Sequence, residues 1–267
     1  MSPTSLYLTI FSALTLSSGA APEHPPANNP KTPARHARIL PVGDSPPFIQ
    51  EVRDGVRVEI DPPAGELPPR ALVTRVRPEE HDKNHPLSPT NVPLSLNRIS
   101  PPLDVPHGNG ILAFDLHGAK PAPSPWLQVT RPESGDFMIL LCRDPKEKSW
   151  NKAASLIIPD GPAGTPAGTV RVTSLFPANI HILWGGEKLL VKPGSSFTRP
   201  IKPETDVAFE VLSVDTEGTA KRYYSNQISQ NPGERGFITI YRADGESPRR
   251  PLKVLVFREP APTPAIQ

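Results

Sequence analysis

Proline is the feature that most restricts the fold of this chain. It accounts for 38 of the 267 residues, or about 14%, against roughly 5% in an average protein. Because proline lacks a backbone N–H and its ring clashes with the preceding helical turn, long uninterrupted helices are disfavoured. Charges are nearly balanced, with 29 Lys and Arg against 27 Asp and Glu. No stripe of like charge is visible along the sequence, which argues against a nucleic-acid-binding protein.

Residues 1–21 have the pattern of a secretory signal peptide. They contain no charged side chain, and an apolar run at 6–16 is followed by the small residues Ser18 and Ala20 at the expected cleavage positions. As a helix, this run would span about 16 Å, which is short of a hydrocarbon core of about 30 Å. We therefore expect an exported protein, periplasmic or extracellular, that is not transmembrane after the signal is removed. The alternative is that the run is a buried strand.

Proline-rich stretches at both ends predict disordered tethers. Residues 22–43 open with a run rich in proline and asparagine, and residues 260–267 are similar in composition. Such segments bury too little apolar surface to offset the entropy lost on ordering. We expect the first to be a linker and the second to be a tail.

Short strand signals dominate the rest of the chain. Residues 56–60 alternate apolar and charged side chains, which is typical of a half-buried strand. Asp54-Gly55 precedes them and predicts a tight hairpin turn, as Gly185-Gly186 does later in the chain. Many short strands separated by Pro and Gly turns predict an all-β sandwich or barrel. Further candidate strands are residues 71–76, 92–96, 110–116, 126–130, 137–142, 154–158, 170–175, 180–184, 188–191, 207–214, 237–241 and 253–257.

Two pairs of segments suggest an internal repeat. Residues 62–76 are similar to 161–175 at a displacement of 99, and residues 134–144 are similar to 234–244 at a displacement of 100. Agreement in order and spacing at several points favours duplication over chance similarity. We therefore predict two tandem antiparallel β-sandwich domains, each of a common domain size. The predicted domains are residues 44–160 and 161–259.

One strand of the first predicted domain is apolar on both faces. When the two segments are aligned at a displacement of 100, Ile238 falls on one face of the strand, which we take as the inward face. Phe137, Ile139 and Leu141 fall on the other face, which is therefore apolar as well. Because a strand that is apolar on both faces is covered on both, we predict that these three side chains form an outer face. This face would pack against the second domain, the N-terminal segment or a partner.

Candidate catalytic groups are few. Cys142 is the only cysteine, so a disulfide within the chain is excluded. A free cysteine at a strand end is either a reactive thiol or a small buried residue, and the second interpretation is favoured. The chain has no nucleophile elbow, phosphate-binding glycine loop or EF-hand loop. We therefore predict a protein that is not an enzyme and has no cofactor.

The histidines form only weak metal-binding patterns. His81 and His85 have the spacing of two ligands on one helix face, but prolines bracket them and favour a solvated loop. Asp115 and His117 project to one face of a predicted strand. His107 could join them only through an unknown loop placement. Zinc needs three or four such donors, so no metal site is predicted.

Four aromatic residues are candidate binding residues. Trp150, Trp184, Tyr223 and Tyr224 lie at predicted strand ends or turns, where a ring could stack on a sugar or contact a partner. We expect Trp150, in a hairpin turn, to be partly exposed. The competing interpretation is that these rings cover the open ends of a sandwich core.

Residues 170–198 resemble a stretch common in exported bacterial Ig-like domains. In both, a strand is followed by a hairpin with a glycine turn and an apolar strand that ends in a Pro-Gly turn, here Pro193-Gly194. Together with residues 50–63, this stretch makes the chain similar to exported bacterial proteins built from Ig-like β-sandwich domains. The resemblance implies a fold and carries over no functional residue.

These observations predict a non-enzymatic binding or structural protein of the bacterial cell envelope. It would engage an envelope protein or a surface glycan through the faces or edges of its sandwiches. The alternative is a carbohydrate-active or metal-dependent hydrolase with a site between the two domains.

Overall fold

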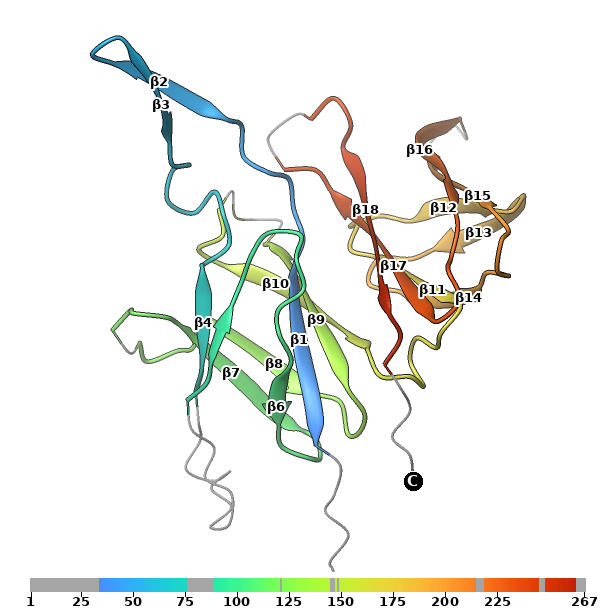
Figure 1. The fold of residues 1–267 in the computed structure, drawn as a ribbon, viewed down its shortest axis with the longest axis horizontal. Coiled ribbons are helices and arrows are strands. Elements are labelled where there is room, and N and C mark those ends of the chain that lie inside the picture. Colours follow the sequence, from blue (N-terminus) through green and yellow to red (C-terminus); the bar gives the residue numbers. More distant parts are fainter. Residues whose placement is uncertain are drawn as a thin grey trace, which may run out of the picture. The chain divides into compact units, whose positions relative to one another are not determined.

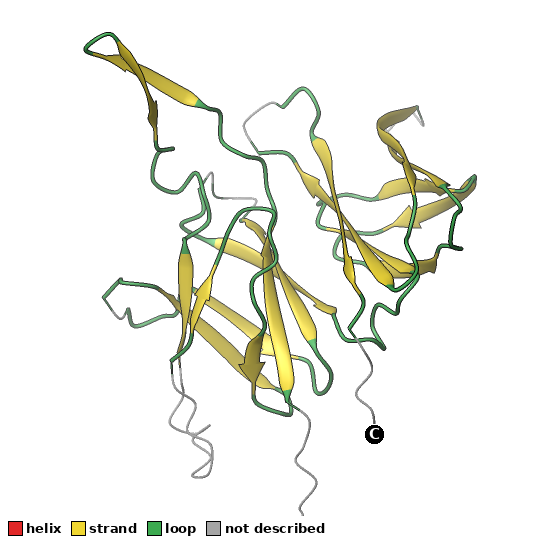
Figure 2. Ribbon diagram, in the orientation of Figure 1, coloured by secondary structure: helices red, strands yellow, loops and turns green. Residues whose placement is uncertain are grey.

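The computed structural model describes residues 34–75, 89–120, 122–144, 147, 149–214, 219–244 and 248–262. Over these residues the regular structure is entirely β, with eighteen strands and no helix (Figure 1 and Figure 2). The all-β prediction is therefore confirmed. Accordingly, this part of the chain has no helix of the length and apolarity needed to cross a membrane. The expected signal peptide lies outside the described residues.

Eight strands form two sheets around one core, which we call the N-terminal sandwich. The sheet orders are β10-β9-β1-β6 and β5-β4-β7-β8. Buried side chains from both sheets, among them Ile39, Phe114 and Ile139, pack together in this core. The strands are β1 (Arg35–Pro41), β4 (Ala71–Arg75), β5 (Asn91–Pro93), β6 (Leu103–Val105), β7 (Gly110–Leu116), β8 (Leu127–Arg131), β9 (Phe137–Arg143) and β10 (Ala153–Pro159).

The last eight strands form a second pair of sheets, which we call the C-terminal sandwich. Their orders are β14-β11-β17-β18 and β13-β12-β15-β16. Its separate core includes Val172, Phe209 and Ile238. The strands are β11 (Thr169–Ser174), β12 (Ile180–Trp184), β13 (Glu187–Val191), β14 (Ser196–Pro200), β15 (Val207–Val214), β16 (Ala220–Ile228), β17 (Glu234–Arg242) and β18 (Leu252–Pro260).

The strand order of one sandwich recurs in the other. Strands β1, β6, β9 and β10 occupy the positions that β11, β14, β17 and β18 occupy later, and β4, β5, β7 and β8 correspond to β12, β13, β15 and β16. In both sandwiches the first strand runs parallel to the penultimate one, and the other described strand pairs are antiparallel. The predicted match of 134–144 with 234–244 joins equivalent strands. The predicted match of 62–76 with 161–175 is wrong, because it aligns β4 with β11, whereas the strand equivalent to β4 is β12. An Ig-like tandem pair stays a prediction.

The predicted linker contains the first strand of the fold. Within residues 22–43, β1 runs from Arg35 to Pro41 and is largely buried between β6 and β9. The linker prediction is therefore wrong for this stretch, since the segment RHARILP supplies a central strand despite its proline-rich surroundings. Residues 22–33 lie outside the described part of the chain. At the other end, β18 includes Pro260, and residues 263–267 are not described.

Both predicted tight turns are present. Asp54 and Gly55 join β2 (Ile49–Arg53) to β3 (Val56–Ile60), with φ angles of 50° and 78°. Gly185 and Gly186, with φ angles of 55° and 90°, join β12 to β13. Positive φ at both central residues matches the right-handed twist of the flanking strands, which explains the preference for Gly and Asp there.

Strand β9 is covered on both faces, but its faces are the reverse of those expected. Phe137, Ile139 and Leu141 lie in the core of the N-terminal sandwich, so their assignment to a partner or interdomain face is wrong. Met138 and Leu140 form the outer face instead. A displacement of 100 residues aligns core positions of β9 with outer positions of β17. Since side chains alternate along a strand, an error of one residue in alignment exchanges the two faces.

A third apolar cluster joins the two sandwiches, and we call it the junction. Leu40, Met138 and Leu140 of the N-terminal sandwich pack there with Phe237 and Tyr241 of the C-terminal one. All are buried, with exposed fractions of 0–8%. The described residues from Ala34 onward accordingly belong to one compact unit.

Four charged residues at one end of the junction form what we call the ionic cluster. The Arg38 guanidinium donates hydrogen bonds to the Asp160 carboxylate and to the Glu259 carboxylate, at 2.6–2.7 Å. Arg235 donates to Glu259 at 2.7 and 2.9 Å and to the Asp160 carboxylate at 2.9 Å. Asp160 and Arg235 are only 5% and 4% exposed as side chains. Because Arg38 and Asp160 belong to one sandwich and Arg235 and Glu259 to the other, these bonds tie the two together.

The ionic cluster should make stability fall in acid. Burial alone would raise the pKa of Glu259, but hydrogen bonds and charges from Arg38 and Arg235 outweigh it and hold the pKa below its ordinary value of 4.5. A depressed pKa stabilises the folded state above the unfolded value, and this contribution is lost as pH falls through the folded value. In urea titrations, the free energy of unfolding of the wild type should fall between pH 7 and pH 3. The fall over the same range should be smaller for Glu259→Gln. An equal loss in both proteins would contradict this role.

Candidate binding site

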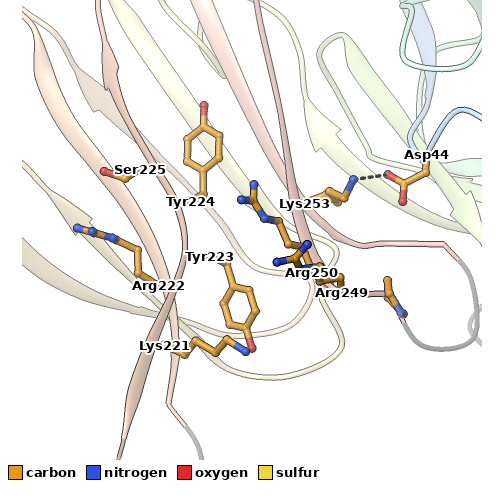
Figure 3. A pocket seen from close by; sticks show the side chains of 10 residues that line it. Asp44, Lys221, Arg222, Tyr223, Tyr224, Ser225, Arg249, Arg250 and Lys253 are labelled. Carbon is orange, nitrogen blue, oxygen red and sulfur yellow. Dashed lines mark ion pairs between the residues drawn. The ribbon is translucent and has the colours of Figure 1, made fainter.

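A basic groove lies on the C-terminal sandwich beside strands β16 and β18. Its volume is about 900 Å³. Figure 3 shows that its side chains come from β16, from the β17–β18 connection and the start of β18, and from the segment after β1. Among the described residues, five cations and a single carboxylate line it. The lining residues are Asp44, Lys221, Arg222, Tyr223, Tyr224, Ser225, Pro248, Arg249, Arg250 and Lys253.

A β-bulge brings two adjacent tyrosines into this groove. Along the pairing of β15 with β16, Val211 lies opposite Tyr224 and Leu212 opposite Arg222, so Tyr223 is the extra residue. In a regular strand, neighbouring side chains point to opposite faces, whereas a bulge turns one of them. Tyr223 and Tyr224 therefore both line the groove and both pack against the core of the C-terminal sandwich.

The two tyrosine rings are held in different ways. The Lys221 ammonium lies 5.3 Å from the centre of the Tyr223 ring, as Figure 3 illustrates. The Tyr224 ring packs edge-on against buried Phe209 at 5.9 Å, and its hydroxyl accepts a hydrogen bond from Asn226. Aromatic rings anchored on a core lose little entropy when they contact a ligand.

The cations of the groove differ in how far they are neutralised. Lys253 lies 3.7 Å from the Asp44 carboxylate (Figure 3). Arg222 lies 3.3 Å from Glu210, which is outside the groove lining. Arg249 and Arg250 are exposed, and among the described residues neither has an ion pair or hydrogen bond. The groove therefore keeps positive charge that is available to an anionic ligand.

A second pocket of about 730 Å³ lies at the other end of the junction. Its lining includes Asp44, Asp244 and Tyr241. The Asp44 carboxylate accepts the Tyr241 hydroxyl and the Asp244 N–H, both at 3.1 Å, and the Asp244 carboxylate accepts the Asp44 N–H at 2.9 Å. This pocket lies where the predicted alternative, a hydrolase with a site between the domains, would have its site. Two of its carboxylates, Asp44 and Asp244, already form hydrogen bonds between the two sandwiches. The hydrolase alternative stays a prediction.

The four predicted binding residues separate into two pairs. Tyr223 and Tyr224 line the groove. Trp150 is only 2% exposed and packs in the core of the N-terminal sandwich, so its expected exposure is wrong. Trp184 is 8% exposed and packs edge-on against Phe209 at 5.8 Å. The two tryptophans fill cores, as the competing interpretation proposed.

Of the candidate metal ligands, the structure describes His107, Asp115 and His117, and it does not bring these three together. His107 precedes β7 and His117 follows it, so the seven residues of the strand separate them by about 20 Å. Asp115 forms an ion pair with Arg75 at 2.6 Å. Among the described residues, no group of three His, Cys, Asp or Glu side chains has a metal-binding arrangement. His81 and His85 lie outside the described residues.

Cys142 is expected to be a poor nucleophile. Burial, and then the negative charges of Asp244 and Asp144, raise the pKa of its thiol to about 11. At pH 8 only about one thiol in a thousand would be ionised. We expect iodoacetamide to alkylate folded Cys142 about a hundredfold more slowly than it alkylates the same residue in urea. Equal rates in the two conditions would show that the thiol is accessible and ionised.

The five cations of the groove were missed in the sequence. They lie in two short segments, Lys221-Arg222 and Arg249 to Lys253, that meet only in the fold. Neither segment is a long basic run, so neither stands out in the sequence. The local signal that could have found them is the presence of Tyr or Pro next to the cations in each segment. A scan of protein-family models gives no match to this chain, and neither does a search of curated proteins.

Proposed function

We propose that this protein is an exported, non-enzymatic binding protein of the bacterial cell envelope that engages an anionic partner through the basic groove. The observation that carries the proposal is the gathering of five cations and two core-anchored tyrosines around one groove, whose described lining holds a single carboxylate. Cations in a concave surface raise the local concentration of anions and speed their association. The signal-like residues 1–21 support export.

The junction gives the groove a rigid scaffold, which supports a binding role. Apolar packing and the ionic cluster fix the two sandwiches together, and Asp44 reaches the groove from the N-terminal sandwich. A groove on a rigid scaffold loses less conformational entropy when it binds a ligand.

The proposal is tested with the full chain and two defined polymers, dextran sulfate and uncharged dextran, in isothermal titrations. We expect binding to dextran sulfate that weakens as salt rises, and none to dextran. The variant Arg249→Gln/Arg250→Gln should bind dextran sulfate about tenfold more weakly, a change of about 1.4 kcal/mol. The matched control Lys188→Gln/Lys192→Gln removes two exposed charges outside the groove lining and should change affinity less than twofold. If both variants lose the same affinity for dextran sulfate, binding depends on net charge alone and the proposal is overturned.

A further inference from the structure

We infer that the partner of the basic groove is an acidic polysaccharide, whose repeating units place an anionic group beside a sugar ring. This inference rests on the proposed function and names the chemistry of its ligand. It follows from three properties of the groove: the protection of its edge strand, the placement of its tyrosines and the state of its guanidinium groups.

The edge strand beside the groove is protected against addition of a polypeptide strand. In the part of the chain that the structure describes, β16 is the last strand of its sheet, and one side of its backbone pairs with no other described strand. The bulge at Tyr223 breaks the regular ladder, and Lys221 and Arg222 put charges on the edge. Bulges and charged side chains are the features by which proteins prevent strand addition at sheet edges. An acidic peptide would therefore gain little from main-chain pairing here, and recognition must come from side chains.

The tyrosines offer ring surfaces next to the cations. Both Tyr223 and Tyr224 are half-buried, with one part of each ring on the core and another part in the groove. An amphipathic ring in such a position contacts an apolar face and still reaches polar groups. A sugar ring presents an apolar face with polar groups at its rim, whereas inorganic polyphosphate presents no apolar face.

The arginines offer planar donors to anionic groups. Arg249 and Arg250 are adjacent in sequence and exposed in the groove lining. A guanidinium can donate two parallel hydrogen bonds to one carboxylate. The volume of about 900 Å³ is at the upper end of the range for small-molecule sites, and it leaves room for several units of a chain.

The test compares three polyanions at equal charge concentration: polygalacturonate, poly-L-glutamate and polyphosphate. We expect the full chain to bind polygalacturonate at least tenfold more tightly than either of the others. Tyr223→Leu keeps an apolar side chain on the core and should weaken polygalacturonate binding about tenfold, with less than twofold change for polyphosphate. The matched control Phe197→Leu alters another half-buried aromatic side chain on the same core, outside the groove lining, and should change neither affinity.

The outcomes separate this inference from the proposed function. If poly-L-glutamate or polyphosphate binds as tightly as polygalacturonate and still depends on Arg249 and Arg250, the polysaccharide inference is overturned and the anion-binding groove stands. If no polyanion binds, both fail. If Tyr223→Leu does not fold, the comparison of the three polymers on the wild-type chain decides alone.

Discussion

Replacing Arg235 by alanine should lower the free energy of unfolding by about 3–5 kcal/mol, because it leaves the Asp160 and Glu259 carboxylates in the junction with Arg38 as their one shared arginine. Arg235 donates to Asp160 and Glu259, and its side chain is 4% exposed. Asp160 would keep only Arg38 as an ionic partner among the described residues. In the low dielectric of the junction, an incompletely paired carboxylate is costly. Urea denaturation at pH 7, followed by circular dichroism, measures the change.

A matched exposed ion pair provides the control for this prediction. Arg199 lies 3.0 Å from Glu187, but the two side chains are 36% and 56% exposed. Exposed pairs contribute about 0–1 kcal/mol, so Arg199→Ala should have an effect in that range. If Arg235→Ala destabilises the chain no more than Arg199→Ala does, the ionic cluster does not hold the two sandwiches together.

Replacing Leu140 by alanine should cost about 2–5 kcal/mol, the range for removing a buried leucine side chain and leaving a cavity. Leu140 is 1% exposed and packs in the junction. This loss of stability is expected only because the even-numbered residues of β9 form its outer face, which packs in the junction. Had the predicted faces been right, Leu140 would belong to the core of the N-terminal sandwich and would make no contact with the C-terminal one.

The control is Leu190→Ala on β13, which removes the same side-chain atoms from an exposed position. Leu190 is 55% exposed, and a substitution at such a position should change stability by no more than about 0.5 kcal/mol. Hydrogen exchange on Leu140→Ala adds a second readout. Faster exchange at β17 as well as at β9 is expected, and an effect confined to the N-terminal sandwich would show that the junction does not couple the two.

Much of the fold could be predicted from the sequence because its strands are short, alternating and bounded by turn residues. The predicted strands at 110–116, 180–184 and 207–214 agree with β7, β12 and β15 to the residue. The two tight turns were predicted because positive φ requires particular residue types. These features are local, so they can be read without knowing what each strand contacts.

The missed strands had weaker local patterns. Strands β6, β14 and β16 lie at sheet edges, where one side faces solvent and apolar alternation is reduced. Strand β1 was hidden in a proline-rich window, although it pairs with β9 and β6. The face of β9 was predicted incorrectly because internal similarity gives an alignment but not the parity of the register.

The candidate site was predicted only in part, for the same reason. Tyr223 and Tyr224 are candidate binding residues in the sequence, and they do line the groove. Their expected position at a strand end or turn is wrong, since both lie within β16. The bulge that turns them toward the groove depends on pairing with β15, which the sequence of β16 alone does not show. The cations come from segments on two sheets, so their joint charge appears only in the fold.

The salt dependence of polyanion binding tests the groove most directly. The logarithm of the binding constant for dextran sulfate should fall linearly with the logarithm of NaCl concentration, by about 0.7 for each cation that contacts a flexible polyanion. Arg249→Gln/Arg250→Gln should reduce this slope by about 1.4, whereas Lys188→Gln/Lys192→Gln should leave it unchanged. A slope that is the same in the wild type and in Arg249→Gln/Arg250→Gln would contradict the assignment of the groove as the binding site.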